Sequence, residues 1–260
     1  MAGKVIMVTG ANSGIGYHLC AALLERGHRV VGLDISSDRA SALQSEYLES
    51  YHFSPCDVTN REQVDAVVQH VIDSWGGIDI LVNNACLAVF RPFLERSDGE
   101  TRKEFEVNYF GSLNLIRAVI PALQTRGGGV IHNLSSGVGL TGFPGLAGYS
   151  STKGALEALT RTLALEFAPL GITVNLIHPP LTDTPSAAPL GVPVEFMADP
   201  AEVGRKLARK IGSRKDLITP DFPTRLGLLA NRLFPGGMGQ MLARMTARAR
   251  EEQQGMGSDE

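Results

Sequence analysis

The feature that most constrains this chain is the regular alternation of short apolar segments with longer amphipathic ones over its first two thirds. Strands that are apolar throughout are typical of parallel sheets covered by helices on both faces. The sequence therefore predicts an α/β fold with one doubly wound parallel sheet flanked by helices. The apolar segments, rich in β-branched residues, predict strands at residues 4–9, 29–34, 52–54, 78–82, 130–134 and 172–177. The amphipathic segments predict helices at residues 13–26, 37–50, 61–75, 101–123 and 149–167.

The pattern changes after residue 184, where a stretch rich in Pro, Ala and Gly indicates a loop. Asp199, Pro200 and Glu202 then predict the start of a helix, since Asp caps it, Pro takes its first position and Glu follows three residues after the cap. This helix is expected to end near residue 211. The remaining expected elements are a strand at 216–219 and helices at 224–234 and 238–250, separated by a Pro-Gly-Gly run at 235–237.

These boundaries predict a single domain with three parts. Residues 1–184 are expected to form its α/β core. Residues 185–250 are expected to form a loop and a helical C-terminal extension of the same domain. Residues 251–260 are expected to be a disordered tail.

Composition and charge exclude several classes of protein. The net charge of −3 disfavours a nucleic-acid-binding body, and no apolar run has the length of a membrane span. The N-terminus runs directly into a strand, so no secretory signal is expected. The three cysteines and six histidines show no metal-ligand spacing, which predicts a protein without a metal. We expect a reduced, cytoplasmic protein.

A glycine-rich turn, Thr9-Gly10-Ala11-Asn12-Ser13-Gly14-Ile15-Gly16, joins the first expected strand to the first expected helix. Residues without Cβ let the backbone approach a phosphate, and the helix N-terminus offers free N–H groups. Taken alone, the turn is equally compatible with a tight strand–helix connection that binds nothing.

Asp34 strengthens the nucleotide interpretation, because it ends the second expected strand about 20 residues beyond the turn. An acidic side chain there accepts hydrogen bonds from the ribose hydroxyls of NAD and repels the additional phosphate of NADP. No Lys or Arg stands at position 13 or 35, and Arg39 is the nearest cation downstream. The sequence therefore predicts NAD in preference to NADP; the alternative is that Asp34 only caps the segment that follows.

Tyr149 and Lys153 stand four residues apart at the start of an expected helix and so share one face. A neighbouring ammonium favours the phenolate, so Lys153 is expected to lower the pKa of Tyr149. Such a pair can exchange a proton with a hydroxyl or carbonyl oxygen. Many exposed helices carry the same pair without function. The glycine-rich turn, together with Ser136 at the end of a strand, makes coincidence a poor explanation.

Together these motifs resemble the short-chain dehydrogenase/reductase family over about residues 3–184. The turn matches the family's Thr-Gly-x-x-x-Gly-x-Gly motif, and Tyr149 and Lys153 match its Tyr-x-x-x-Lys motif. Ser136 stands thirteen residues before Tyr149, the gap usual in the family, and is preferred to Ser135 for that reason. Further matches, in the family's order, are Asp57-Val58, Asn83-Asn84-Ala85, Asn108 in the long middle helix, and His178-Pro179 followed by Thr182 and Thr184.

The resemblance implies a Rossmann-type fold and hydride transfer to or from a nicotinamide. It implies that Tyr149 exchanges a proton with the substrate, that Ser136 holds the substrate oxygen, and that Lys153 also anchors the nicotinamide ribose. Asn108 is expected to support a water that relays the proton. The implied cofactor-binding residues are Gly10, Asn12, Ser13, Gly14, Ile15, Gly16, Asp34, Asp57, Val58, Asn84, Ala85, Tyr149, Lys153, Pro179, Thr182 and Thr184.

The chain departs from the family pattern at several places. Cys86 and Pro180 stand where the family has Gly, which predicts a changed pocket wall and a stiffer loop. The terminal Asp-Gly-Gly motif used in tetramer packing is missing. Residues 205–250 instead carry eleven Lys or Arg and two Asp, a net charge of +9. The last expected helix has a stripe at Met238, Met241, Leu242 and Met245 that predicts packing on the domain or a partner subunit, a pocket lid, or contact with a lipid surface.

We therefore expect an NAD(H)-dependent enzyme that interconverts a secondary alcohol and a ketone. An apolar substrate such as a lipid, steroid or terpenoid is favoured, because the stretches expected to close its pocket, 90–94, 140–147 and 185–197, carry few charges. The alternatives are an NADPH-dependent carbonyl reductase of a lipid or acyl thioester, and a non-catalytic dinucleotide sensor or scaffold. The family resemblance implies a homodimer or homotetramer, built on the helices at 101–123 and 149–167, with peripheral lipid contact through 224–250 as a further possibility.

Overall fold

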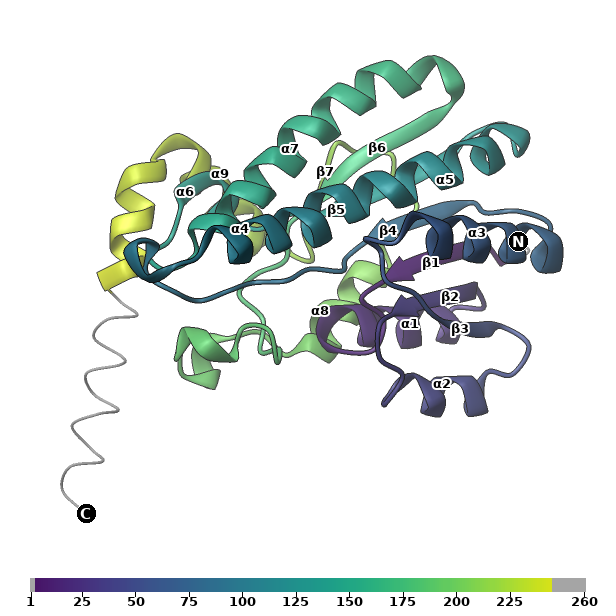
Figure 1. The fold of residues 1–260 in the computed structure, drawn as a ribbon, viewed down its shortest axis with the longest axis horizontal. Coiled ribbons are helices and arrows are strands. Elements are labelled where there is room, and N and C mark those ends of the chain that lie inside the picture. The colour runs from purple at the N-terminus through teal and green to yellow at the C-terminus, as the bar shows by residue number, and fades with distance from the viewer. Residues whose placement is uncertain (1–2, 245–260) are drawn as a thin grey trace.

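Seven parallel strands form one sheet in the order β3-β2-β1-β4-β5-β6-β7 (Figure 1). The computed structural model describes residues 3–244. The predicted doubly wound parallel sheet, flanked by helices, is confirmed, and the strand boundaries agree closely with the expected ones. The strands are β1 (Val5–Thr9), β2 (Arg29–Asp34), β3 (Tyr51–Pro55), β4 (Ile80–Asn83), β5 (Gly129–Leu134), β6 (Ile172–Ile177) and β7 (Leu217–Ile218).

Helices cover both faces of the sheet and produce two hydrophobic cores. Because side chains alternate along a strand, Ile6 and Val8 of β1 pack toward α1 and α8, whereas Val5 and Met7 pack toward α3 and α5. The helices are α1 (Gly14–Glu25), α2 (Ala40–Glu46), α3 (Arg61–Trp75), α4 (Asp98–Phe105), α5 (Gly111–Thr125), α6 (Val138–Thr141), α7 (Ala147–Phe167), α8 (Pro200–Ala208) and α9 (Phe222–Leu233).

The long middle helix differs from the expected one in its start and its regularity. It begins at Asp98, because Ser97 and Glu100 form a reciprocal capping box. It then runs through α4, a π-helical turn (Glu106–Phe110) and α5. A π turn widens a helix locally and often marks a functional site; here it carries Asn108.

Two other expected helices also change. The helix expected at 37–50 is shortened to α2, because the side chain of Asn12 accepts the amides of Arg39 and Ala40 and thereby fixes its start. The Pro-Gly-Gly run at 235–237 is not a break: Phe234 alone separates α9 from a helix whose described part covers 235–244. Proline suits the first position of a helix, where no N–H partner is needed. Residues 245–250 of the last expected helix, which include Met245, and the expected tail at 251–260 lie outside the described residues.

The functional end of the fold lies beyond the carboxyl ends of the strands. In Figure 1 this is the left-hand end, where the segment after β4, the stretch before α8 and the yellow C-terminal helices gather. The sheet order reverses between β1 and β4, and ligands of open α/β sheets bind at such a switch point. Among residues 3–244, no helix combines the length and the apolar character needed to cross a membrane.

A buried ion pair ties the segment after β4 to the middle helix near this end. Arg96 and Glu104 are both almost fully buried, and the guanidinium Nη2 lies 2.7 Å from the carboxylate Oε2. The amide of Val89 donates to Glu104, and Arg96 in turn donates to the carbonyl of Val89. The amide of Tyr149, at the start of α7, also bonds to Glu104. One carboxylate therefore fixes three segments that surround the functional end.

Removing one partner of this pair should destabilise the fold strongly. An Arg96→Met variant leaves the Glu104 carboxylate buried without its cation, and we expect a loss of about 3–5 kcal/mol in the free energy of unfolding. Urea denaturation at neutral pH measures it. The double variant Arg96→Met/Glu104→Gln should recover part of the loss, because the buried charge is then gone. If Arg96→Met lowered the free energy of unfolding by less than about 1 kcal/mol, the pair would contribute no more than an exposed salt bridge does.

Candidate active site

A cavity of about 1170 Å³ collects most of the predicted site residues. Its walls come from the β1–α1 turn, the ends of β2, β4, β5 and β6, and the first turns of α7; α9 and residues 238–242 close one side. Three predicted residues, Asn12, Gly16 and Asn108, do not line it. Those that do are Gly10, Ser13, Gly14, Ile15, Asp34, Asp57, Val58, Asn84, Ala85, Ser136, Tyr149, Lys153, Pro179, Thr182 and Thr184.

The glycine-rich turn forms a cradle in which the glycines leave no room for a side chain. Gly10 and Gly14 have φ of +66° and +51°, a left-handed conformation that favours glycine. A Cβ on Gly10 would stand 2.7 Å from Nδ2 of Asn84. Helix α1 starts at Gly14 with no hydrogen bond from the side chain of its N-cap, Ser13. The first amides of α1 are therefore available to an anionic group at the cavity wall.

Gly16 and Asn12 act inside the protein instead. A Cβ on Gly16 would collide with the carbonyl oxygen of Gly10, so this glycine permits close packing of α1 under the turn. Asn12 is buried, and besides capping α2 it donates through Nδ2 to Ser36. Both residues support the glycine-rich turn from inside the protein and do not face the cavity.

Asp34 presents its carboxylate at the cavity wall. Its Oδ2 accepts the amide of Asn12 at 3.0 Å, and its Oδ1 accepts the amide of Ile35 at 2.8 Å. The guanidinium of Arg39 stacks over the ring of Tyr17 at 4.1 Å from the ring centre. Arg39, the nearest downstream cation in the sequence, is thus engaged with an aromatic ring.

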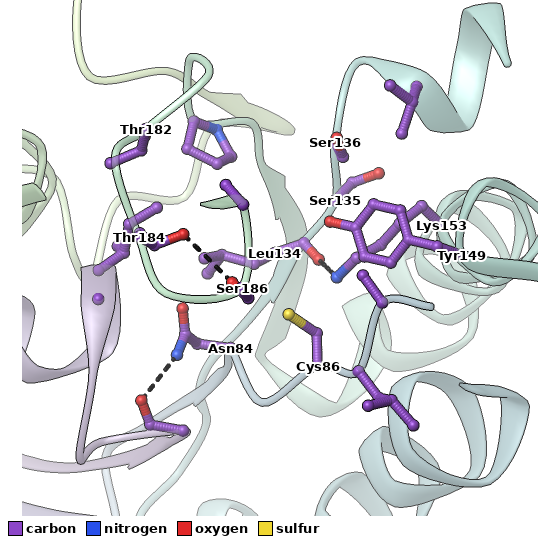
Figure 2. Close-up of a pocket in the computed structure, with 18 of the residues that line it drawn as sticks. Asn84, Cys86, Leu134, Ser135, Ser136, Tyr149, Lys153, Thr182, Thr184 and Ser186 are labelled. Atoms are coloured by element: carbon purple, nitrogen blue, oxygen red, sulfur yellow. Dashed lines mark hydrogen bonds between the residues drawn. The ribbon is translucent and has the colours of Figure 1, made fainter. Parts of the chain in front are cut away.

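Ser136, Tyr149 and Lys153 meet at the floor of the cavity (Figure 2). Lys153 is almost fully buried and donates through Nζ to the carbonyl of Leu134, the last residue of β5, at 2.7 Å. Its Nζ lies 5.5 Å from the centre of the Tyr149 ring. Ser136 forms a side-chain hydrogen bond with Tyr149. A hydroxyl, a phenol and an ammonium are therefore assembled where β5 ends and α7 begins.

Asn108 lies beside this group but outside the cavity. Its Nδ2 donates to the carbonyl of Leu87 and to the hydroxyl of Thr152, and its Oδ1 accepts the amide of Leu87. The side chain therefore joins the middle helix to the segment after β4 and to α7. Thr152 neighbours Lys153 in the chain, so Asn108 braces the catalytic helix.

A family model described as short chain dehydrogenase matches residues 4–192. The chain belongs to the short-chain dehydrogenase family. It is 36% identical over 183 residues to a 3-alpha-(or 20-beta)-hydroxysteroid dehydrogenase of Mycobacterium tuberculosis, covering 70% of each chain.

Solved structures of family members extend the similarity to the fold. A 3-ketoacyl-(acyl-carrier-protein) reductase from Brucella melitensis, complexed with NADH, superposes with a TM-score of 0.76 at 28% identity, over 84% of this chain and 95% of that one. ElxO with NADP bound gives a TM-score of 0.74 at 26% identity with the same coverage. The chain is thus an oxidoreductase of this family with a nicotinamide dinucleotide cofactor. The two neighbours differ in which dinucleotide they hold.

Burial has the largest effect on the protonation of Tyr149 in this short-chain dehydrogenase. Burial raises the pKa of Tyr149 well above its ordinary value, and negative charge on Cys86 and Glu104 acts in the same direction, while the hydrogen bond with Ser136 opposes it. Burial also lowers the pKa of Lys153. The ammonium of Lys153 is directed to the carbonyl of Leu134, and burial dominates the pKa of Tyr149 in the free protein. The expected lowering of this pKa by Lys153 stays a prediction.

Cys86 and Pro180, which stand where the family has Gly, both lie at the cavity. Cys86 is exposed and lines the wall between Asn84 and Tyr149 (Figure 2). Pro180 lines it too, and its carbonyl accepts the hydroxyl of Thr182 at 2.9 Å. Thr184 shares a hydrogen bond with Ser186. The loop after β6 therefore reaches the cavity despite the proline.

Sequence reasoning missed a buried polar cluster beneath the floor. Oε1 of Glu157 lies 3.2 Å from Nε2 of His178 and accepts the hydroxyl of Ser135 at 3.1 Å. Burial acts to raise the pKa of Glu157, but the interactions with His178 and Ser135 hold it below its ordinary value. His178 belongs to a matched motif and Ser135 was weighed against Ser136, whereas Glu157 carried no motif. Its only sequence signal is its position four residues after Lys153 on the same helix face.

The state of Tyr149 can be measured directly. Because burial dominates, we expect the free protein to show no tyrosinate from Tyr149 below about pH 10. The measurement is the ultraviolet absorbance titration of the wild type minus that of Tyr149→Phe. A Lys153→Met variant should leave this difference nearly unchanged. A tyrosinate component near neutral pH that disappears in both variants would show that the lysine controls the pKa in the free protein.

Proposed function

We propose that this protein is an NAD(H)-dependent oxidoreductase that interconverts a secondary alcohol and its ketone, with a bulky apolar substrate. The observation that carries the proposal is the assembly of Ser136, Tyr149 and Lys153 at the floor of a cavity that also contains the glycine-rich turn and Asp34. A non-catalytic sensor or scaffold would need the cofactor cleft but would not need this trio. The intact trio therefore favours an enzyme.

The residues present fit a dinucleotide. The uncapped start of α1 and the left-handed backbone at Gly10 and Gly14 suit a pyrophosphate, which needs N–H donors and close backbone approach. The carboxylate of Asp34 suits ribose hydroxyls and would repel a 2′-phosphate, and the nearby Arg39 stacks on the ring of Tyr17. Asp57 and Val58 would flank the adenine. Pro179, Thr182 and Thr184 would face the nicotinamide carboxamide.

The bound nicotinamide supplies the hydride acceptor or donor. Ser136 donates a hydrogen bond to the substrate oxygen and stabilises the charge that develops on it. Tyr149 gives a proton to this oxygen during reduction and accepts it during oxidation. Lys153, held by the carbonyl of Leu134, lies beside the phenol and would hydrogen-bond the ribose. Asn108 keeps the helix that carries both residues in register.

The substrate side of the cavity is largely apolar. All three predicted stretches contribute, and neither Arg91 nor Glu195 lines the cavity. The C-terminal helices contribute as well, in agreement with the pocket-lid alternative for the last helix. The apolar lining residues on this side are Leu87, Phe90, Val138, Phe143, Leu146, Leu190, Val192, Leu228, Met238 and Leu242. A large apolar alcohol or ketone fits such a wall, and one relative is named a hydroxysteroid dehydrogenase.

The second candidate is an NADPH-dependent reductase of a lipid or acyl thioester. It is supported by the structural neighbour named a ketoacyl reductase and by Lys103, a cation that lines the cavity. The position of Asp34 weighs against it.

We further propose a homodimer built on the middle helix and α7, with a homotetramer as the alternative. These helices run side by side on one face of the sheet (Figure 1), and Leu165 of α7 is 79% exposed. A cytoplasmic location stays a prediction.

Turnover of a panel of secondary alcohols of increasing apolar size tests the proposal. We expect NADH to form from NAD, with rates that favour the larger alcohols, and we expect Tyr149→Phe to lower kcat at least about a hundredfold. Tyr47→Phe, on the far side of the fold, is the matched control and should retain activity. Full activity of Tyr149→Phe would contradict the mechanism. Tight NADH binding without turnover of any panel member would favour the sensor, and faster turnover with NADP would favour the second candidate.

A further inference from the structure

Helix α9 has two faces of different character on opposite sides. One face lines the cavity, through Thr224, Gly227, Leu228 and Asn231. The other carries a continuous apolar stripe at spacings of four, three and four residues, which places all its members on one side of the helix. The stripe consists of Phe222, Leu226, Leu229 and Leu233, which are between 52 and 73% exposed.

Other exposed apolar side chains lie at the same end of the molecule. Phe234 and Met241 continue from α9 into the following helix. Phe93 and Leu94, before α4, and Val194 and Phe196, before α8, belong to segments that gather at this end in Figure 1. Residues near each of these segments line the cavity, so the exposed apolar groups belong to segments of the cavity wall. An exposed apolar patch of this extent marks an interaction surface.

The charge of the C-terminal helices favours an anionic partner for the α9 stripe, whereas Glu95 and Glu195 are exposed beside the other apolar residues. Residues 222–244 contain Arg225, Arg232 and Arg244 and no Asp or Glu. Arg225 and Arg232 are exposed and seven residues apart, so they lie along the same border of the stripe. In a two-fold contact with a second copy, this patch would face itself and bring cations together. An apolar stripe bordered by arginines instead complements an anionic, apolar-centred surface.

We propose that the α9 stripe docks this protein on the surface of a lipid bilayer that contains anionic headgroups. Phe222, Leu226, Leu229 and Leu233 enter the boundary between headgroups and acyl chains, and Arg225 and Arg232 pair with the lipid phosphates. The docking itself does not depend on the proposed dehydrogenase activity.

Sedimentation of the full-length protein with vesicles tests the docking. The vesicles are phosphatidylcholine with and without phosphatidylglycerol. We expect the wild type to bind the phosphatidylglycerol vesicles, and binding to weaken as salt is raised. Leu226→Gln and Leu233→Gln should each weaken binding roughly tenfold, since each removes a leucine from the acyl boundary. Arg225→Gln/Arg232→Gln should weaken binding only to the vesicles that contain phosphatidylglycerol.

Leu48→Gln is the matched control, because Leu48 is 74% exposed but lies between α2 and β3 and does not line the cavity. It should bind as the wild type does. Light scattering of each variant reports the molar mass in solution. The proposal would be overturned if the wild type did not bind the anionic vesicles, or if the stripe variants bound them as well as the control does. A lower molar mass of the stripe variants would assign the stripe to contact between copies. Turnover of a water-soluble alcohol without vesicles tests the proposed function separately.

Discussion

The site depends first on how the ends of β1 and β4 are joined. The hydroxyl of Thr9 accepts the amides of Asn84 and Ala85, both at 2.9 Å, and Asn84 Nδ2 donates to the carbonyls of Thr9 and Gly10 at 2.8 and 3.1 Å. These four bonds link adjacent strands from which the chain continues in opposite directions across the sheet. The backbone of the glycine-rich turn is thereby held with its N–H groups toward the cavity. Without this connection, neither the cradle nor the wall that carries Cys86 would have a defined position.

From that connection the remaining chemistry is assembled by parallel strands ending at one edge. The end of β2 brings Asp34, and the end of β5 brings Ser136 together with the carbonyl that holds Lys153. Burial is the second determinant, because it favours a neutral phenol at Tyr149 in the free protein. A positively charged oxidised nicotinamide beside it would favour the phenolate. On this account, cofactor binding prepares the tyrosine for oxidation.

Local signals in the sequence predicted the sheet and most of the cavity lining, because strand periodicity and glycine-rich turns act over a few residues. These local signals failed where the position of a residue depends on packing between segments that are distant in the sequence. Gly16 shares a motif with Gly14, yet it packs against the carbonyl of Gly10 rather than facing the cavity. The pairing of Arg96 with Glu104 joins residues without a motif. The two-faced character of α9 follows from where the cavity lies, which periodicity alone does not specify.

The most direct test of this account is a calorimetric titration of NADH and of NADPH into the wild type and into Asp34→Ala. The arrangement of Asp34 and the stacked Arg39 predicts that the wild type binds NADH at least tenfold more tightly, since ribose hydroxyls pair with the carboxylate and a 2′-phosphate is repelled. The variant should lose most of that preference. Equal or tighter binding of NADPH by the wild type would contradict the central claim that the end of β2 selects NAD.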